Sequence, residues 1–186
     1  MKKLVPLLLL SPMAFADPMM DALNDHATSQ LLPLSSNAVI IDAIKAQNAK
    51  NANISQDEIN TLDKTWRAEV GAGNQPLISK TLGNDLSAHL VSVQEQSDGL
   101  YTEIFVMDMK GLNVGQSAVT SDYWQGDEAK FQDTYGKGPN SVLVGEIEED
   151  ESTQTFQSQV SLAITDPSTG KVIGAITYGI NVDELE

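Results

Sequence analysis

The sequence of 186 residues predicts an α+β fold in which helices come first and an antiparallel sheet follows. Two observations support this prediction. Before residue 100, apolar residues recur at spacings of three and four, which is typical of one face of a helix. From Leu100 onward the spacing changes to two, and β-branched and aromatic residues become frequent, as in strands. Because the helical and strand patterns are segregated along the chain, a helix-covered antiparallel sheet is favoured over alternating βαβ units.

A long N-terminal helix is predicted by a single apolar stripe. The members of this stripe are Leu23, Ala27, Leu31, Leu34, Ala38 and Ile41. Pro33 falls within it and removes one backbone hydrogen bond, so we expect the helix to kink or break there. Ser35 or Ser36 is then expected to cap a second piece that runs to about Ala49.

Further helices are predicted before the sheet begins. Ser55 and Glu58 have the spacing of a capping box, in which each side chain accepts a hydrogen bond from a free backbone N–H of the other residue. That helix should run to about Glu69 and bury three apolar side chains, Ile59, Leu62 and Trp66. After a loop over residues 71–76, a second apolar stripe from Leu77 to Val93 predicts one continuous helix that ends near Asp98-Gly99.

Five strands are predicted from residue 100 to the end of the chain. They cover residues 101–108, 112–117, 141–148, 159–165 and 172–181. Lys110-Gly111 separates the first two strands, and the Pro- and Gly-containing run 166–171 separates the last two. Both are turn sequences, so the strands on either side should form antiparallel hairpins.

The first sixteen residues have the features of a secretory signal. Lys2 and Lys3 precede the apolar run Leu4–Leu10, and Ala14 and Ala16 fit a small-residue cleavage site. We expect cleavage after Ala16, which leaves residues 17–186 as one domain with a mainly helical part (17–99) and a sheet part (100–186). The apolar run is too short to span a bilayer. With no cysteine in the sequence, disulfides contribute nothing.

The chain is strongly acidic, which restricts its partners. Removing residues 1–16 takes away Lys2 and Lys3 and changes the formal charge from −15 to −17. Nucleic acid and anionic membrane surfaces would repel such a protein, because phosphate binding needs clustered Lys and Arg. A cationic ligand, a metal ion or a basic partner is easier to bind, although an acidic surface also serves solubility alone.

Four segments together carry a resemblance to a known family. They are the broken N-terminal helix (31–48), the strand-turn-strand EIFVMDMKGLNVGQS (103–117), the aromatic and acidic loop TSDYWQGDEAKF (120–131) and the closing hairpin (166–185). In order and spacing they resemble a Cache-type, PAS-like periplasmic sensor domain, also called a PDC sensor domain. The resemblance covers almost all of the chain after residue 16. It implies a long N-terminal helix on a five- or six-stranded antiparallel sheet, with a small-molecule pocket on the sheet beneath the loop.

The predicted ligand site combines this loop with aromatic residues of the sheet. We expect it to consist of Phe105, Asp122, Tyr123, Trp124, Asp127, Lys130, Tyr135 and Tyr178. Aromatic rings can wall a pocket, acids can orient an amine, and a lysine can meet a carboxylate. The alternative is that Tyr123 and Trp124 pack in the core and the acids are turn residues. The loop has no arginine, and Gly179 stands where amino-acid-sensing relatives carry an aspartate, so the clamp for an α-amino acid is not implied.

No catalytic, metal or cofactor site is predicted. Four acids of the loop region could coordinate calcium, namely Asp122, Asp127, Glu128 and Asp133, yet the ordered spacing of a calcium loop is absent. The acidic run over residues 146–151 is interpreted as a solvated loop. His26 and His89 lie in helical stripes without a second ligand at useful spacing. No nucleophile motif or phosphate loop is present, so we do not expect an enzyme.

The sequence therefore indicates a soluble periplasmic module that binds a small organic amine or carboxylate. Because the chain stops at Glu186 without a membrane span, we expect it to act through a membrane receptor or kinase. Two alternatives remain open, an interaction or structural protein with a vestigial pocket and a calcium-binding module. The stripe from Leu23 to Ile41 would serve a homodimer as well as the sheet, because both need the same spacing.

Overall fold

A computed structural model describes residues 18–150 and 155–185 of the chain. The expected signal peptide and its cleavage site lie outside these residues. The helical part contains α1 (Pro18–His26), a π-helical turn (Ala27–Leu31), α2 (Leu32–Ser35), α3 (Ala38–Lys50), α4 (Gln56–Glu69), α5 (Pro76–Leu82) and α6 (Asp85–Glu95). The rest contains β1 (Tyr101–Met107), β2 (Asn113–Gln116), α7 (Ala129–Gln132), β3 (Val142–Val144), β4 (Glu148–Asp150), β5 (Thr155–Thr165), β6 (Val172–Asn181) and a final 3-10 turn (Val182–Glu184).

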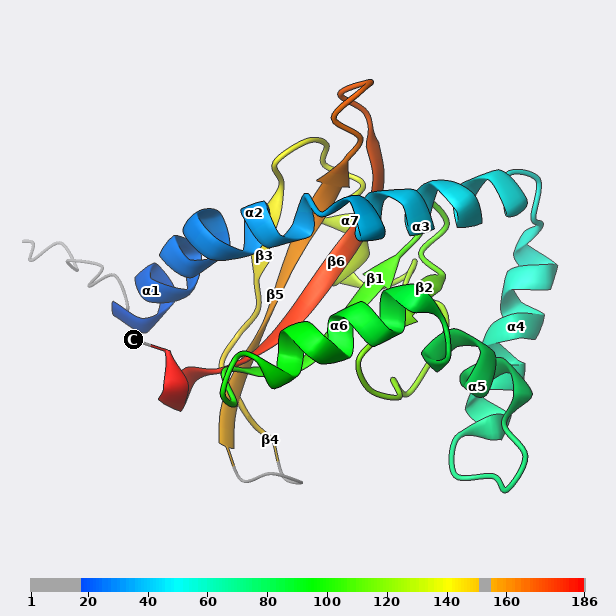
Figure 1. The fold of residues 1–186 in the computed structure, drawn as a ribbon, viewed down its shortest axis with the longest axis horizontal. Coiled ribbons are helices and arrows are strands. Elements are labelled where there is room, and N and C mark those ends of the chain that lie inside the picture. Colours follow the sequence, from blue (N-terminus) through cyan, green and yellow to red (C-terminus); the bar gives the residue numbers. More distant parts are fainter. Residues whose placement is uncertain (1–17, 151–154, 186) are drawn as a thin grey trace, which may run out of the picture.

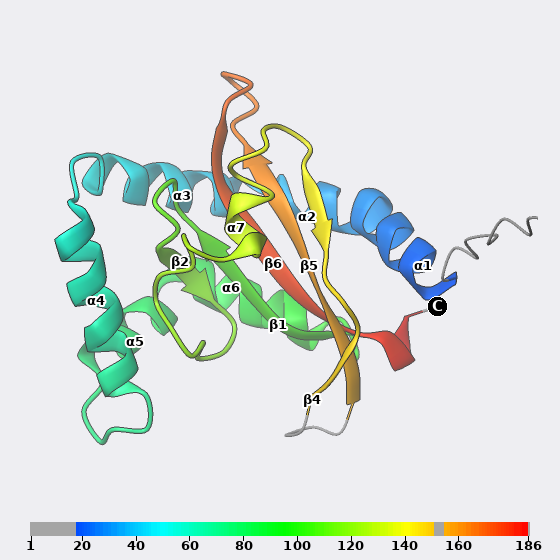
Figure 2. The ribbon, with the colours of Figure 1, turned by 180° about the vertical axis from the view of Figure 1, so that it is seen from behind.

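The strands form one antiparallel sheet in the order β2-β1-β6-β5-β3, and β4 pairs with the far end of β5. Helices α1 to α3 and α6 cross one face of this sheet, and Figure 1 shows them in front of the strands. Figure 2, from behind, shows α7 on the opposite face. The expected α+β class and the expected antiparallel sheet of five or six strands are confirmed, the sheet having six, and a long N-terminal helix packs on it as the PAS-like architecture requires.

The N-terminal helix differs from the prediction in its phase. The π-helical turn at 27–31 inserts one extra residue, which rotates everything after it about the helix axis. As a result Ser35 is buried and Leu34 is 40% exposed, although the sequence stripe placed Leu34 in the core. Ser35 Oγ lies 3.3 Å from the hydroxyl of Tyr178, so a polar contact replaces the expected apolar one.

The helix also breaks later than expected. Pro33 lies near the start of α2, directly after the π-helical turn, and the chain continues as a helix past it. The break falls at Ser36, and Asn37 caps α3 by accepting a hydrogen bond from the backbone N–H of Val39 at 2.9 Å. The cap predicted at Ser35 or Ser36 is therefore wrong by one or two residues.

Helix α4 begins and ends as predicted, and the helix after it is divided. Both bonds of the Ser55–Glu58 capping box are present. The single helix expected from Leu77 to about Asp98 is two helices, because Asn84 caps α6 by accepting from the backbone N–H of Ser87, and α5 ends before it at Leu82. An asparagine cap inside an apolar stripe overrides the helical spacing around it.

The last two strands match the predicted hairpin, and the strand expected at 141–148 is divided into β3 and β4. The buried apolar residues form more than one core. The main core lies between the sheet and the N-terminal helices and includes Leu23, Ile44, Ile104, Ile176 and Tyr178. A second core joins α4 and α5 to the loop after β2, through Trp66 and Tyr123 among others. Across the residues that the structure describes, no helix is both long enough and apolar enough to cross a membrane.

Candidate functional site

The face of the sheet that carries α7 has a row of side chains running across four strands. Gln116 of β2 pairs with Phe105 of β1, Phe105 pairs with Thr177 of β6, and Thr177 pairs with Ser161 of β5. Directly paired residues point to the same face, so the four side chains form one line. All four are buried, and the hydroxyls of Ser161 and Thr177 lie 2.9 Å apart. A buried polar row on a sheet face is a candidate for ligand contact.

Helix α7 and the segment directly after it cover this row with aromatic and basic side chains. The Nζ of Lys130 lies 5.4 Å from the centroid of the Phe105 ring, over its face, and also pairs with Glu128 at 3.0 Å. Phe131 and Tyr135 stack with their ring centroids 4.9 Å apart and pack on the same small core as Phe105. Burial, followed by the charge of Asp108, raises the pKa of Tyr135 above its ordinary value. Two aromatic rings and one ammonium group therefore cover the row.

Next to Phe105, a cluster of amide side chains forms the floor of the loop after β2. Asn113 Nδ2 donates to the side-chain oxygen of Gln116 at 2.9 Å, to the hydroxyl of Thr120 at 3.0 Å and to the backbone oxygen of Asp122 at 3.2 Å. Gln125 Nε2 donates to the same backbone oxygen at 3.2 Å. Asn113, Gln116 and Gln125 are each exposed by 1% or less. The acceptor shared by Asn113 and Gln125, together with the Asn113–Gln116 bond, places the three amides in one buried cluster, which we call the amide cluster.

Each amide of this cluster has one atom without a hydrogen-bond partner among the described residues. These atoms are Asn113 Oδ1, Gln116 Nε2 and Gln125 Oε1. Buried polar atoms are almost always hydrogen-bonded, and an unsatisfied one costs about 1–3 kcal/mol. Three in one cluster mark a place where a ligand or ordered water completes the bonding. The set offers two acceptors and one donor.

A groove adjoins the other end of the row. It has a volume of about 250 Å³ and is lined by Gly145, Glu146, Glu148, Glu149, Gln157 and Gln159. Gln159 Nε2 donates to Glu103 Oε1 at 2.9 Å, one step along the sheet from Ser161 and Phe105. The carboxylates give this end of the face a negative potential, which favours the approach of a cationic group over an anionic one.

Of the eight residues predicted for the ligand site, three come together on this face. Phe105, Lys130 and Tyr135 share the small core and the ammonium–ring contact under α7. Tyr178 lies on the opposite face, where Ser35 and the tilted ring of Tyr101 contact it. Asp127 is exposed on the loop. Neighbouring residues of β6 alternate between faces, so Thr177 rather than Tyr178 belongs to the row.

The remaining three predicted residues fasten their loop to α4. Asp63 Oδ1 accepts hydrogen bonds from the backbone N–H groups of Tyr123 and Trp124, at 2.9 and 3.1 Å. Arg67 Nη2 donates to Asp122 Oδ2 at 2.9 Å and its Nε donates to Asp63 Oδ2 at 2.7 Å. These contacts hold the loop in place, and the loop in turn presents the Asp122 carbonyl to the amide cluster.

The two aromatic rings of the loop are packed rather than open. Tyr123 is 8% exposed and stacks on Trp66, with ring centroids 5.2 Å apart. Burial and then the charge of Asp108 raise the pKa of Tyr123 to about 12, so its phenol is neutral. Trp124 Nε1 donates to the backbone oxygen of Lys110 at 2.8 Å. In this structure both rings contact protein groups, as the alternative interpretation of Tyr123 and Trp124 as packing residues expects.

The acids considered for calcium are engaged elsewhere or dispersed. Asp122 pairs with Arg67, Glu128 with Lys130 and Asp133 with Lys137. In the two described stretches of chain, no group of three His, Cys, Asp or Glu side chains is arranged to hold a metal ion. Three of the four acids are thus paired with a cation, and the fourth, Asp127, is exposed.

Two features of the site concern the amino-acid clamp of related sensors. A Cβ added to Gly179 would collide with the Thr102 hydroxyl and lie 2.9 Å from Glu103 Cγ, so an aspartate does not fit this backbone without displacement of those side chains. The loop itself has no arginine, and the arginine that contacts it, Arg67 of α4, is paired with two carboxylates. Sequence reasoning missed Arg67 because 55 residues separate it from Asp122.

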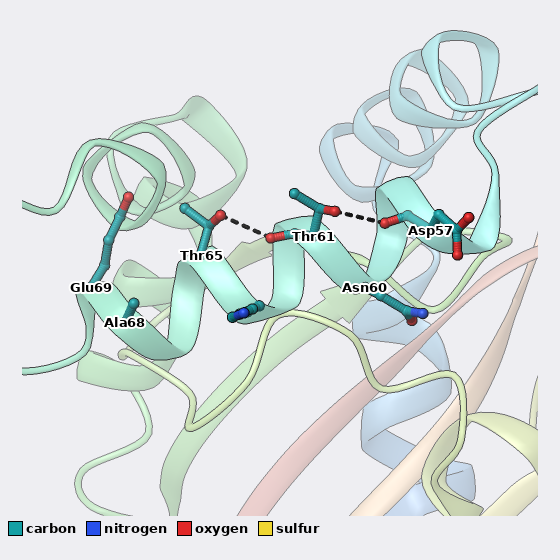
Figure 3. Close-up of a pocket in the computed structure, with 7 residues that line it drawn as sticks. Asp57, Asn60, Thr61, Thr65, Ala68 and Glu69 are labelled. Carbon is teal, nitrogen blue, oxygen red and sulfur yellow. Dashed lines mark hydrogen bonds between the residues drawn. The ribbon is translucent and has the colours of Figure 1, made fainter.

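Another hollow, on the outer side of α4, is an ordinary helix surface. Figure 3 shows that its lining side chains, Asp57 to Glu69, all come from this one helix. The hydroxyls of Thr61 and Thr65 are bonded to backbone oxygens one turn earlier, at 2.7 and 2.8 Å. With these donors used within the helix and open solvent opposite, the hollow lacks converging polar groups.

Comparison with known proteins gives similarity of fold alone. No family model matches the sequence, and no curated protein matches it. Solved structures do match: the sensor domain of the histidine kinase DctB from Vibrio cholerae has 11% identity and a TM-score of 0.48, over 90% of this chain and 55% of that domain. The sensory domain of the chemoreceptor Tlp3 from Campylobacter jejuni has 14% identity and a TM-score of 0.43, over 91% and 66% respectively.

A third similar structure is the ligand-binding domain of the amino-acid chemoreceptor PctC from Pseudomonas aeruginosa in complex with GABA. It has 13% identity and a TM-score of 0.43, over 85% of this chain and 63% of that domain. The chain is thus similar to sensor domains of histidine kinases and chemoreceptors, and it spans between half and two thirds of their length.

Proposed function

We propose that this protein is a periplasmic sensor module that binds a small organic molecule between the sheet and the loop that follows β2, with no enzymatic activity of its own. The amide cluster carries this proposal, because three buried polar atoms in one place have no partner among the described residues. Ordered water alone would satisfy them as well. Lys130 over the Phe105 ring, and the hydroxyls of Ser161 and Thr177 in the same row, supply further contacts that favour an organic ligand.

The chemistry of the site restricts the ligand. Gln116 is the cross-strand partner of Phe105, and the Lys130 ammonium lies over the Phe105 ring, so a carboxylate or carbonyl bound beside that ring would have two donors in its neighbourhood. Asn113 Oδ1 and Gln125 Oε1 are acceptors and suit an amine or a hydroxyl. We therefore propose a small organic amine or carboxylate, with a flat or apolar part that packs on Phe105.

A thermal-shift screen of the purified chain tests the proposal. The compounds are amines, short carboxylates, amino acids and divalent cations. A ligand at about 100 times its Kd stabilises the fold by roughly 2.7 kcal/mol, which raises the Tm of a domain of this size by about 5–10 °C. If no compound raises the Tm, the binding function is wrong.

A pair of glutamine variants locates the ligand once a compound is found. Gln116→Met removes the unpartnered donor and keeps the side-chain size, so it should abolish most of the shift. Gln132→Met changes an exposed glutamine of α7 and is the matched control, which should keep the shift. Equal shifts in both variants would show binding at another place.

The cellular setting is part of the same proposal. The signal-like N-terminus and the similarity to sensor domains support export to the periplasm, and a membrane receptor or kinase is the proposed recipient of the signal. Fractionation of cells that express the chain, followed by mass spectrometry of its N-terminus, tests export and cleavage after Ala16. Recovery in the cytoplasm with residues 1–16 attached would contradict both.

A further inference from the structure

A second cavity lies where α3 and α5 meet β2, and its lining residues differ from those of the amide cluster. It has a volume of about 140 Å³ and opens between the C-terminal end of α3, α5 and β2. Its polar lining consists chiefly of Gln47, Lys50, Asn51, Lys80 and Tyr123. Liquid water occupies about 30 Å³ per molecule, so this space corresponds to roughly four or five waters. A molecule of about five non-hydrogen atoms would fill it.

The charge of the lining is unusual for this protein. The sequence has 26 acids and 11 bases, yet the described residues that line this cavity include two lysines and no acid. Neither Lys50 nor Lys80 forms an ion pair with a residue in the described ranges. Two unpaired ammonium groups on adjoining elements give the cavity a local positive potential within an acidic molecule, which attracts anions.

A buried acid behind the lining, Asp108, has both side-chain oxygens engaged in hydrogen bonds. Asp108 is fully buried behind Gln47 and Asn51, and its Oδ2 accepts from their side-chain nitrogens at 3.1 and 2.8 Å. Its Oδ1 accepts from the backbone N–H groups of Lys110 and Leu112. Because both amide nitrogens point to Asp108, the groups that Gln47 and Asn51 retain for a ligand are their oxygens.

The rest of the lining favours one type of anion, because part of it is apolar. Leu62, Leu77 and Val114 form an apolar part of the lining. The Tyr123 phenol is neutral at ordinary pH because burial and Asp108 raise its pKa to about 12, and it can therefore donate to an anion. A carboxylate with a short hydrocarbon part fits these walls better than phosphate, which has no apolar side.

From this arrangement we infer that the cavity is a binding site for a short carboxylate of two to four carbons, separate from the proposed sensor site. The carboxylate lies between Lys50 and Lys80, and the hydrocarbon part faces Leu62 and Val114. A hydroxyl on the ligand donates to the Gln47 or Asn51 oxygen, so a hydroxycarboxylate binds more tightly than its deoxy analogue. The inference does not depend on the ligand of the amide cluster.

Side-chain amide NMR of the full chain tests this site. Sodium lactate, sodium propionate and inorganic phosphate are titrated separately at constant ionic strength, to roughly 20 times a Kd of about 1 mM. We expect saturable shifts of the Gln47, Asn51 and Asn84 amide signals with lactate, weaker binding of propionate and no saturation with phosphate. Absence of saturation with both carboxylates, or tighter binding of phosphate, overturns the assignment.

Two double variants of equal charge separate a site from general electrostatic attraction. Lys50→Gln with Lys80→Gln should weaken lactate binding by about tenfold or more, because charge-assisted hydrogen bonds are lost. Lys64→Gln with Lys171→Gln removes two exposed lysines outside the cavity and should leave binding within about twofold. Equal affinities in the two variants contradict the site. Shifts confined to the Gln116 and Gln125 signals would instead assign lactate to the amide cluster.

Discussion

Arg67 Nη2 donates to Asp122 Oδ2 at 2.9 Å, and this ion pair joins α4 to the loop that covers one edge of the sheet. The same loop is held from below by Asp63, which accepts from the backbone N–H groups of Tyr123 and Trp124. Residues far apart in the sequence thereby fix the backbone carbonyl to which the amide cluster is bonded. The position of the proposed site depends on these contacts at the edge of the sheet.

We expect Asp63→Ala to destabilise the fold more than Arg67→Ala. The first change leaves two backbone N–H groups without their acceptor and should cost about 1–3 kcal/mol. The Arg67 side chain is 53% exposed, so its loss should cost at most about 1 kcal/mol. Urea unfolding measures both values, with Asn60→Ala on the exposed side of α4 as control. Equal effects of the two variants would show that the backbone bonds to Asp63 contribute little.

Lys130→Met should remove the response to any carboxylate found in the thermal-shift screen. The ammonium group over Phe105 is then absent, while the methionine side chain still covers the ring. Lys137→Met, on the segment directly after α7, is the control because that side chain is 65% exposed and pairs with Asp133. A response that survives in Lys130→Met but is lost in Lys137→Met would place the ligand outside the row.

Acid should weaken the hairpin turn between β5 and β6 through Asp166. The pKa of Asp166 is lowered to about 2 by hydrogen bonds from the Ser168 side chain and backbone, and further by Lys45. Because this pKa lies below the ordinary value of 3.8, the stabilisation is present above about pH 4 and is lost as the pH falls toward 2. We expect the stability difference between the native chain and Asp166→Asn to shrink over that range in urea unfolding. A difference that stays constant contradicts it.

His26 should make stability depend on pH in a higher range. Burial lowers the pKa of His26 below its model-peptide value of 6.5, and its Nε2 lies 3.2 Å from the Tyr101 hydroxyl. The unfolded chain takes up the proton first, so the stabilisation present above pH 6.5 is lost as the pH falls through that value. Relative to His26→Gln, the native chain should lose stability between pH 7 and 5.5. An NMR titration that gives an ordinary pKa would contradict this.

Gly174→Ala should destabilise the pairing of β6 with β1. A Cβ at this position would collide with the backbone oxygen of Met107 and come within 3.1 Å of Ile44 Cγ2. Overpacking against backbone typically costs about 1–3 kcal/mol. Gly73→Ala is the matched control, since a Cβ there meets nothing within 4 Å and its φ is not in the left-handed region. Equal unfolding free energies for the two variants would show that β6 shifts to accommodate the added Cβ without a loss of stability.

The fold could be predicted from the sequence where local patterns act alone. The Ser55 capping box, the change of period at Leu100 and the closing hairpin are all local, and each has its expected form. The sequence could not predict which residues after 31 face the sheet. The π-helical turn at 27–31 rotates the following side chains about the helix axis, and the spacing of apolar residues in the sequence gives no sign of it. The division at Asn84 depends on one side-chain cap that competes with an apolar stripe.

The candidate site was less accessible to sequence reasoning. Phe105 and Lys130 were predicted for it, but Asn113, Gln116 and Gln125 were missed because uncharged amides are common on exposed strands and loops. Their burial is set by the loop that returns over β2, a tertiary arrangement without a local signal. The sequence did hold one indication of the buried position of Gln116. This residue ends β2, and the partner strand β1 contains the apolar run 104–107.

The most direct test of the proposed function is an NMR titration of the side-chain amides of Asn113, Gln116 and Gln125 with the compound that most raises the Tm. We expect these three signals to shift together and to saturate at one Kd, while the exposed amides of Gln56 and Gln132 stay in place. If the compound binds with saturation and the amide-cluster signals do not move, the ligand site is not on this face of the sheet and the central proposal is wrong.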